Sequence, residues 1–131
     1  MLLLDRCISA GSGIAEAEVV IGPESTFYAG DRGVPAWIGI EYMAQTIGLL
    51  AGEDARSQGD EAPTGYLLGT RRMQSSLAWF PEGARLRVTA TELYVDDNGL
   101  GAYDCAVFHE DQRVCSCRLT VYRRPGELEQ R

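Results

Sequence analysis

The stretch DRGVPAWIGIEYMAQTIGLLAG, residues 31–52, is apolar over most of its length but, beyond Asp31 at its start, carries one carboxylate, Glu41, near its middle. Pro35 suits the first position of a helix because its missing backbone N–H would have had no partner there. Apolar residues at helical spacing then form a stripe wide enough to predict a helix over about Ala36–Arg56 that is buried on most sides. A carboxylate is costly to bury unless it is paired or protonated, so Glu41 needs a structural or chemical reason.

Length and charge limit the class of protein around this helix. The chain has 131 residues, a net charge of −7, and no lysine among its 12 basic residues. This length predicts one domain with a sizeable core. The acidity argues against nucleic-acid binding, and the lack of lysine excludes Schiff-base chemistry. No signal peptide or membrane-spanning helix is expected, which favours a cytoplasmic protein.

The cysteines give no metal-binding pattern. All 4 lack CxxC spacing and have no histidine cluster near them, so we expect no metal site. Cys115 and Cys117 are expected to lie on one face of a strand as small buried apolar residues. Nothing in the sequence indicates a nucleotide, flavin or other cofactor.

The rest of the chain reads as strands. Two short strands at 2–9 and 14–21 are joined by the turn AGSG. Four strands in a meander are expected after the helix, at 65–80, 84–95, 100–110 and 113–124, with Asn98-Gly99 marking one turn. The sequence therefore predicts an α+β domain over 1–124, in which one antiparallel sheet of about six strands wraps the helix, and a frayed tail over 125–131.

Several segments of the sequence resemble those of a known family. LLLDRCIS (2–9), IEYMAQTIGLLAG (40–52) and GYLLGTRRMQ (65–74) resemble the hotdog-fold 3-hydroxyacyl-acyl-carrier-protein dehydratases. VPAWIGIEYMAQ (34–45) is similar to the dehydratase-like subunits of aryl-polyene-type biosynthetic clusters. The resemblance implies a hotdog fold, activity in fatty-acid or polyene-type biosynthesis, and dimers that build acyl tunnels at their interface. It also implies an acyl carrier protein with a phosphopantetheine-linked acyl chain as partner.

The resemblance implies roles for five residues. Glu41 matches the acid that works with a histidine to remove water from a 3-hydroxyacyl thioester, one side chain taking the α-proton and the other helping the hydroxyl leave. Gln45 matches a glutamine one turn later, and Gly69 matches a glycine on the strand after the helix. Ala36 and Trp37 match the place where backbone amides polarise the thioester carbonyl, which suits the positive end of a helix.

The catalytic histidine of the family has no counterpart in the loop before the helix. Counting back from Glu41 without gaps puts Phe27 at that position, whereas matching TFYAG to the family with a shortened loop puts Asp31 there. Asp31 is therefore a candidate replacement, although Asp before Arg-Gly is also ordinary turn chemistry. The only histidine, His109, is expected in an exposed turn. A lost general base typically costs about 10²–10⁴-fold in rate.

The arginines have two interpretations each. Arg32, Arg71 or Arg72 is a possible ion-pair partner for Glu41, in a network that would hold a dimer together rather than perform chemistry. Arg71 and Arg72, with a second pair at 123–124, either keep edge strands solvated or dock an acidic carrier protein or the phosphate of its prosthetic arm.

Three hypotheses for function remain open from the sequence. The chain is an active dehydratase in which Asp31 replaces the histidine, or a non-catalytic partner of a histidine-bearing hotdog subunit in a heterodimer. The third hypothesis is a hotdog acyl thioesterase in which Glu41 activates water or attacks the thioester. The choice between homodimer and heterodimer is also left open.

Overall fold

The computed structural model describes residues 2–57 and 65–123. Ten elements follow one another along this part of the chain: β1 (Arg6–Gly11), β2 (Ile14–Val20), β3 (Val34–Pro35), the 3₁₀ turn η1 (Ala36–Ile38), α1 (Gly39–Ser57), β4 (Gly65–Ser75), β5 (Trp79–Phe80), β6 (Arg85–Val95), β7 (Leu100–His109) and β8 (Gln112–Arg123). The expected tail at 125–131 lies outside the described residues, and so do residues 58–64 of the loop after the helix.

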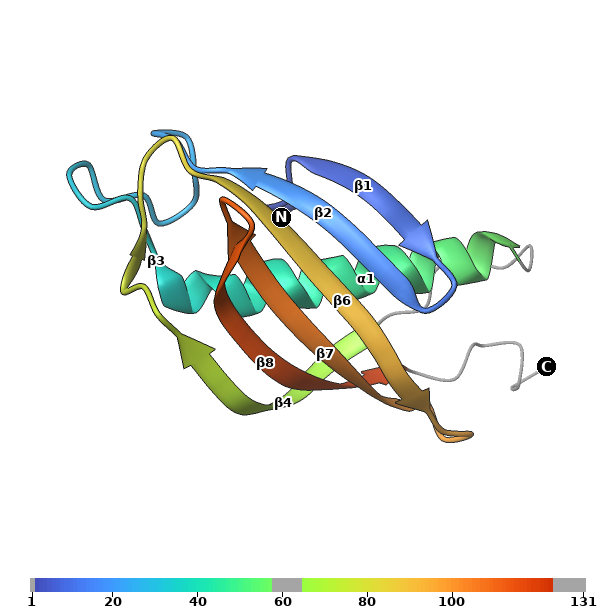
Figure 1. Cartoon of the computed structure of the whole chain (residues 1–131). Coiled ribbons are helices and arrows are strands. Elements are labelled where there is room, and N and C mark those ends of the chain that lie inside the picture. The colour runs from blue at the N-terminus through green and yellow to red at the C-terminus, as the bar shows by residue number, and fades with distance from the viewer. Residues whose placement is uncertain (1, 58–64, 124–131) are drawn as a thin grey trace.

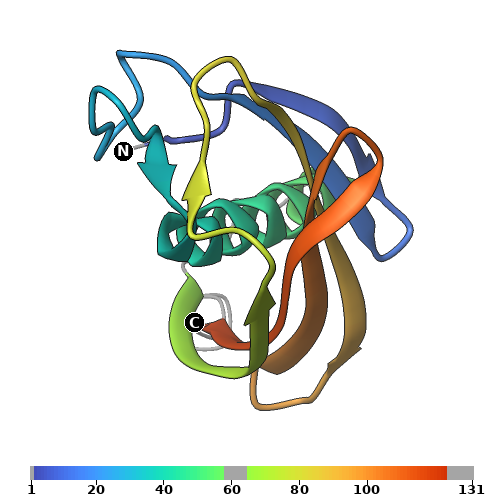
Figure 2. The same cartoon turned by 60° about the vertical axis from the view of Figure 1, so that its left-hand side comes forward.

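Six strands form one antiparallel sheet in the order β1-β2-β6-β7-β8-β4. The sheet curves around α1, which crosses behind it in Figure 1 and lies along its concave side in Figure 2. The two remaining strands, β3 and β5, pair with each other at the start of the helix. The predicted architecture, one helix wrapped by a six-stranded antiparallel sheet, is confirmed.

Alternation along the strands places the core between sheet and helix. In β6, Leu86, Val88 and Ala90 are fully buried, while the residues between them point to the opposite face of the sheet. Met43 and Leu50 of α1 are likewise fully buried against these strands. One face of the sheet and one side of the helix therefore share a single apolar core.

The prediction of a four-strand meander after the helix was wrong for the first strand. β4 pairs with β8 at the sheet edge and not with β6, its neighbour in sequence. The expected strand 65–80 is also divided, because β5 leaves the sheet to pair with β3 and carries the chain past the helix start to β6. Alternation fixes which face of a strand is buried, but it does not fix the neighbouring strand.

The helix is less buried than its sequence predicted. Ile38, Met43, Ile47 and Leu50 are buried as expected, but Trp37 is 61% exposed. Glu41 and Gly48 are exposed as well. The sheet covers one side of α1, and no described element covers the other, so the apolar stripe is wider than the surface that one chain buries.

The turns follow their sequence signals. Ser12 and Gly13 both have positive φ, 55° and 80°, as a tight two-residue hairpin requires. At the Asn98-Gly99 turn, the Asp96 carboxylate accepts the N–H groups of Asn98 and Leu100, both at 2.9 Å. These side-chain contacts explain why short polar residues occupy the turns.

Gly33 provides a test of how the helix start is anchored. Its φ is +96°, and an added Cβ would meet the carbonyl oxygen of Phe80 and lie 2.9 Å from the carbonyl carbon. We expect Gly33→Ala to lower the free energy of unfolding by about 3 kcal/mol or more, since backbone strain adds to a clash with β5. Urea unfolding followed by circular dichroism measures it.

Gly30 is the matched control in the same loop, because a Cβ there would meet nothing within 4 Å. Gly30→Ala should change stability by less than about 0.5 kcal/mol. Equal stability of Gly33→Ala and Gly30→Ala would show that the loop does not need the close approach to β5.

Candidate functional site

The start of the helix is fixed to the short sheet beside it. Val34 and Pro35 pair with Phe80 and Trp79, and the N–H of Ala36 donates to the carbonyl of Ala78 at 2.9 Å. Of the two amides expected to polarise a carbonyl, that of Ala36 is therefore already engaged. Among the described residues, no hydrogen-bond acceptor takes the N–H of Trp37, which remains available to a ligand.

Glu41 lies one turn beyond Trp37 on the same side of the helix. Its Oε1 accepts a hydrogen bond of 3.3 Å from Nε2 of Gln45, whose Oε1 in turn accepts the N–H of Leu3 at 2.7 Å. The N-terminal segment thus orients Gln45, and Gln45 orients the carboxylate. The prediction that Glu41 is buried was wrong for the single chain, because the sheet packs against the other side of α1.

None of the three arginines proposed as partners pairs with Glu41 within the part of the chain that the structure describes. Arg32 instead lies over the ring of Trp79, with its guanidinium carbon 5.5 Å from the ring centroid. Arg71 and Arg72 lie exposed on β4. Glu41 therefore has no arginine partner among the described residues of one chain, and an ion-pair network across a dimer stays a prediction.

An exposed aromatic pair flanks the helix start. Phe27 and Trp37 are each 61% exposed, and their ring centroids lie 5.6 Å apart at an interplanar angle of 53°. Phe27 has φ 65°, a conformation that costs energy for a bulky side chain and that histidine adopts more readily. An apolar ring that cannot carry a proton therefore occupies the position that ungapped counting assigned to the family's histidine.

Asp31 lies exposed in a tight loop that the backbone closes on itself. The N–H of Ala29 donates to the carbonyl of Gly33 at 2.7 Å, and the N–H of Arg32 donates to Ala29 at 2.9 Å. Partial burial and the nearby carboxylates of Glu82 and Asp31 raise the pKa of the Tyr28 phenol. No contact between described residues joins Asp31 to Glu41.

Gly69, Arg71 and Arg72 share β4, away from the helix start. A Cβ at Gly69 would meet nothing within 4 Å, so packing inside one chain does not require glycine there. Arg71 lies directly opposite Arg118 of β8, so the two strands whose arginine pairs were expected to lie close together are neighbours. The structure does not bring these residues into contact with Glu41.

No contact between described residues joins Cys115, Cys117 or His109 to Glu41. Cys115 and Cys117 are 2% and 5% exposed, as predicted, and Sγ of Cys117 lies 3.7 Å from Sδ of Met43. His109 ends β7 and is only partly exposed, with Nε2 3.9 Å from the Glu110 carboxylate. Among the described residues, no group of three or more potential ligands is arranged to hold a metal ion, and no helix is long and apolar enough to cross a membrane.

One long helix wrapped by a six-stranded antiparallel sheet, with an acid on the first turns of the helix, defines a hotdog-fold protein. The model of one family within that class, the ApeP-like family (ApeP dehydratase), matches residues 1–131. This chain belongs to the ApeP-like dehydratase family.

Solved structures confirm the fold. The dehydratase heterocomplex ApeI:P from Xenorhabdus doucetiae is similar with a TM-score of 0.85 and 24% identity, over 98% of this chain and 88% of that chain. A hypothetical thioesterase with coenzyme A from Streptococcus pneumoniae TIGR4 is similar with a TM-score of 0.70 and 10% identity, over 90% and 84% of the two chains. The protein smu.793 from Streptococcus mutans UA159, bound to acetyl CoA, has a TM-score of 0.68 and 14% identity over 90% and 86%. No curated protein matches the chain.

The buried thiols and phenol give a prediction about pH. Burial raises the pKa of Cys117 to about 12 from 9.0, and burial together with Asp5 raises that of Tyr42 to about 12 from 10.0. These groups ionise at a lower pH in the unfolded chain than in the folded protein. The free energy of unfolding is therefore unaffected by them below about pH 9 and falls as the pH rises towards 12. Urea unfolding at pH 8, 9.5 and 10.5 should therefore show a falling free energy of unfolding.

Cys117→Ala provides the control for that measurement. It should make the decline with pH shallower, since one of the groups that ionises on unfolding is gone. A free energy of unfolding that stays constant from pH 8 to pH 10.5 in the parent chain would contradict the prediction.

Proposed function

We propose that this chain is one subunit of a two-chain dehydratase that removes water from 3-hydroxyacyl thioesters carried by an acyl carrier protein. In this proposal a second hotdog subunit supplies the histidine that this chain lacks. The observation that carries it is an incomplete site at the helix start. The free N–H of Trp37 and the oriented carboxylate of Glu41 lie on one exposed side of the helix, beside Phe27 instead of an imidazole.

The chemistry assigns a separate task to each group. The Trp37 N–H, at the positive end of the helix, polarises the thioester carbonyl and so acidifies the α-carbon. The imidazole of the second subunit removes the α-proton, and the Glu41 carboxyl gives a proton to the 3-hydroxyl. The C–O bond then breaks, water leaves and a 2-enoyl thioester forms.

The exposure of Glu41 gives a reason for a second subunit besides the histidine that it supplies. In the single chain the carboxyl is exposed to solvent. Covering it with a second subunit excludes water from the site, which strengthens the electrostatic contacts between the carboxyl and a bound substrate. Gln45 then keeps the carboxyl aimed along the helix, since it is itself held by Leu3.

Two features of the surface support a second subunit of this kind. Phe27 and Trp37 expose large aromatic rings side by side, and exposed apolar patches often mark protein–protein contacts. β4 lies at an edge of the sheet where no described strand pairs with it, and strand pairing with another chain would cover this edge. The similar ApeI:P structure is a dehydratase heterocomplex, which agrees with an assembly of two unlike chains.

The other hypotheses differ in which chain acts or in which product forms. If Asp31 replaces the histidine, a homodimer of this chain would dehydrate the substrate without help. The thioesterase hypothesis is favoured by the exposure of Glu41, which water reaches directly, and by a chemistry that needs no histidine. The docking of the acyl carrier protein on Arg71 and Arg72 remains a separate prediction.

The decisive experiment incubates a 3-hydroxyacyl carrier protein with this chain alone, with a histidine-bearing hotdog partner alone, and with both. Intact mass spectrometry of the carrier reports the products. We expect the loss of one water to be fastest with both chains, and Glu41→Gln to slow it by about 100-fold or more, since a positioned acid contributes 10²–10⁴-fold. Asp31→Asn is the matched control and should retain most of the activity.

Each of the other outcomes contradicts the proposal in a recognisable way. Dehydration by this chain alone that Asp31→Asn abolishes would support the single-chain enzyme. Loss of the whole acyl group, leaving the bare carrier thiol, would support a thioesterase. Full activity of the pair with Glu41→Gln would assign this chain a non-catalytic role.

The aromatic pair predicts where the second subunit binds. Trp37→Ala should weaken association with that subunit about 30-fold, because buried tryptophans are frequent interface hot spots worth about 2 kcal/mol or more. Isothermal titration calorimetry measures the dissociation constant. Leu93→Ala, which removes another exposed apolar side chain on β6, should leave it within about 2-fold. Equal effects of the two substitutions would place the interface elsewhere.

A further inference from the structure

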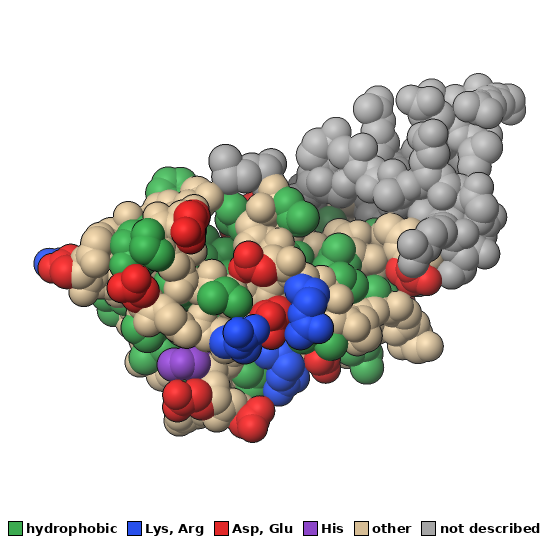
Figure 3. Space-filling model, turned by 90° about the horizontal axis from the view of Figure 1, so that it is seen from above, with side chains coloured by type: hydrophobic (Ala, Val, Ile, Leu, Met, Phe, Trp, Pro, Cys, Tyr) green, Lys and Arg blue, Asp and Glu red, His purple; other side chains and the backbone are tan. Residues whose placement is uncertain are grey.

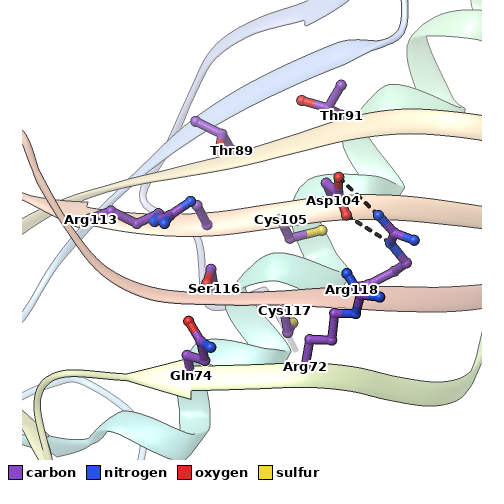
Figure 4. A pocket seen from close by; sticks show the side chains of 11 residues that line it. Arg72, Gln74, Thr89, Thr91, Asp104, Cys105, Arg113, Ser116, Cys117 and Arg118 are labelled. Carbon is purple, nitrogen blue, oxygen red and sulfur yellow. Dashed lines mark hydrogen bonds and ion pairs between the residues drawn. The ribbon is translucent and has the colours of Figure 1, made fainter.

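The outer face of the sheet, on the side away from α1, carries a hollow of about 400 Å³ that the proposed dehydration does not use. Small side chains form its floor, and longer polar ones from four neighbouring strands form its rim (Figure 4). The main lining residues are Arg72, Gln74, Thr89, Arg113, Ser116 and Arg118. The sheet separates this hollow from the helix, since Cys117 points inward to Met43 while its neighbours Ser116 and Arg118 line the hollow.

Arginines elsewhere on this face have acidic partners. Arg6 and Arg85 lie 3.4 and 2.8 Å from the Glu18 carboxylate, and Arg87 lies 3.6 Å from Glu16. Figure 3 shows basic and acidic side chains gathered together on the side of the molecule that it presents. At the β1–β2–β6 end of the sheet, each of these three arginines therefore has a carboxylate partner, with Glu18 shared by two of them.

The hollow differs because its positive charge is not matched. Asp104 pairs with Arg118 at 2.9 Å, but no described carboxylate pairs with Arg72 or Arg113. Arg71 adds to the imbalance because it lies directly opposite Arg118, and like charges opposite each other destabilise a sheet. A chain with a net charge of −7 thus gathers four arginines around one aspartate.

The backbone at Arg72 has a strained conformation. The register of β4 against β8 shifts between Arg71 and Gln74, and Arg72 within this bulge has φ 57°. Bulges re-aim side chains, and a non-glycine residue at positive φ stores strain. Figure 4 shows the Arg72 side chain extending from β4 across β8 beside Arg118, over the hollow.

We propose that this hollow binds the phosphate group of a small ligand, held by Arg72, Arg113 and Arg118. Planar guanidinium groups match the oxygens of a phosphate in two-point contacts. The hydroxyls of Thr89 and Ser116 and the amide of Gln74 add neutral donors around them. An anion bound here offsets the repulsion between Arg71 and Arg118. The hollow is larger than one phosphate ion, which leaves space for the rest of a phosphate ester.

Nuclear magnetic resonance titration of the full chain tests this proposal. The probes are inorganic phosphate and glycerol 3-phosphate, each compared with sodium chloride at the same ionic strength to remove general screening. We expect saturable shifts of the backbone amides of Thr89, Ser116 and Arg118 with both phosphates and not with chloride. Tighter binding of glycerol 3-phosphate identifies an ester as the preferred ligand, and equal or tighter binding of inorganic phosphate identifies the free ion.

Variants separate a built site from a general effect of charge. Arg113→Gln and Arg72→Gln should each weaken phosphate binding by about 10-fold or more, as expected for losing a charge-assisted hydrogen bond. Arg113→Lys should weaken it less, because lysine keeps the charge but loses the planar two-point contact. Arg85→Gln makes the same charge change outside the hollow and should alter binding by less than about 2-fold. Because Arg72 lies in the bulge, Arg72→Gln is used only if it unfolds cooperatively. If it does not, Arg113→Gln alone tests the site.

Two results would overturn the proposal. One is an absence of saturable phosphate-specific shifts in the parent chain. The other is equal weakening by Arg85→Gln and Arg113→Gln. Neither result bears on the proposed dehydration, since the hollow and Glu41 lie on opposite sides of the sheet.

Discussion

The packing of the sheet against one side of α1 is the constraint on which the other features depend. Six antiparallel strands give the helix a continuous apolar surface, into which Met43, Ile47 and Leu50 pack. Because one sheet covers only one side of a helix, the opposite side faces solvent and carries Trp37, Glu41 and Gly48. The packing that stabilises the domain therefore also leaves the residues of the proposed chemistry exposed on the other side of the helix.

The short β3–β5 sheet determines what the start of the helix can offer to a ligand. It binds the backbone of Ala36 through Ala78 and leaves the next amide, that of Trp37, without an acceptor among the described residues. Gly33 allows this anchoring because its backbone lies against that of Phe80, where no side chain would fit. The position of the Trp37 N–H relative to the Glu41 carboxylate is thus set by a loop, a two-stranded sheet and a 3₁₀ turn.

Charge is distributed on the outer face of the sheet in two ways. At one end, each arginine pairs with a glutamate, and such exposed pairs contribute little to stability. At the other end, the arginines of β4 and β8 outnumber the single aspartate beside them. The net charge of the whole chain hides this difference, because electrostatic attraction to a ligand is set by charges within about 10 Å at moderate salt.

Sequence alone is enough to predict the α+β class, the helix, the hairpins and the burial of Cys115 and Cys117. Each follows from local periodicity or from turn chemistry, as with Ser12-Gly13 and Asn98-Gly99. It also singled out Glu41 and the missing histidine, because these rest on residue identity. The three-dimensional structure was needed to show that β4 pairs with β8, that Glu41 is exposed, and that the Ala36 amide is engaged. Strand partners, the side of the helix that the sheet covers and hydrogen-bond acceptors depend on residues distant in sequence, which a local pattern of apolar and polar residues does not specify.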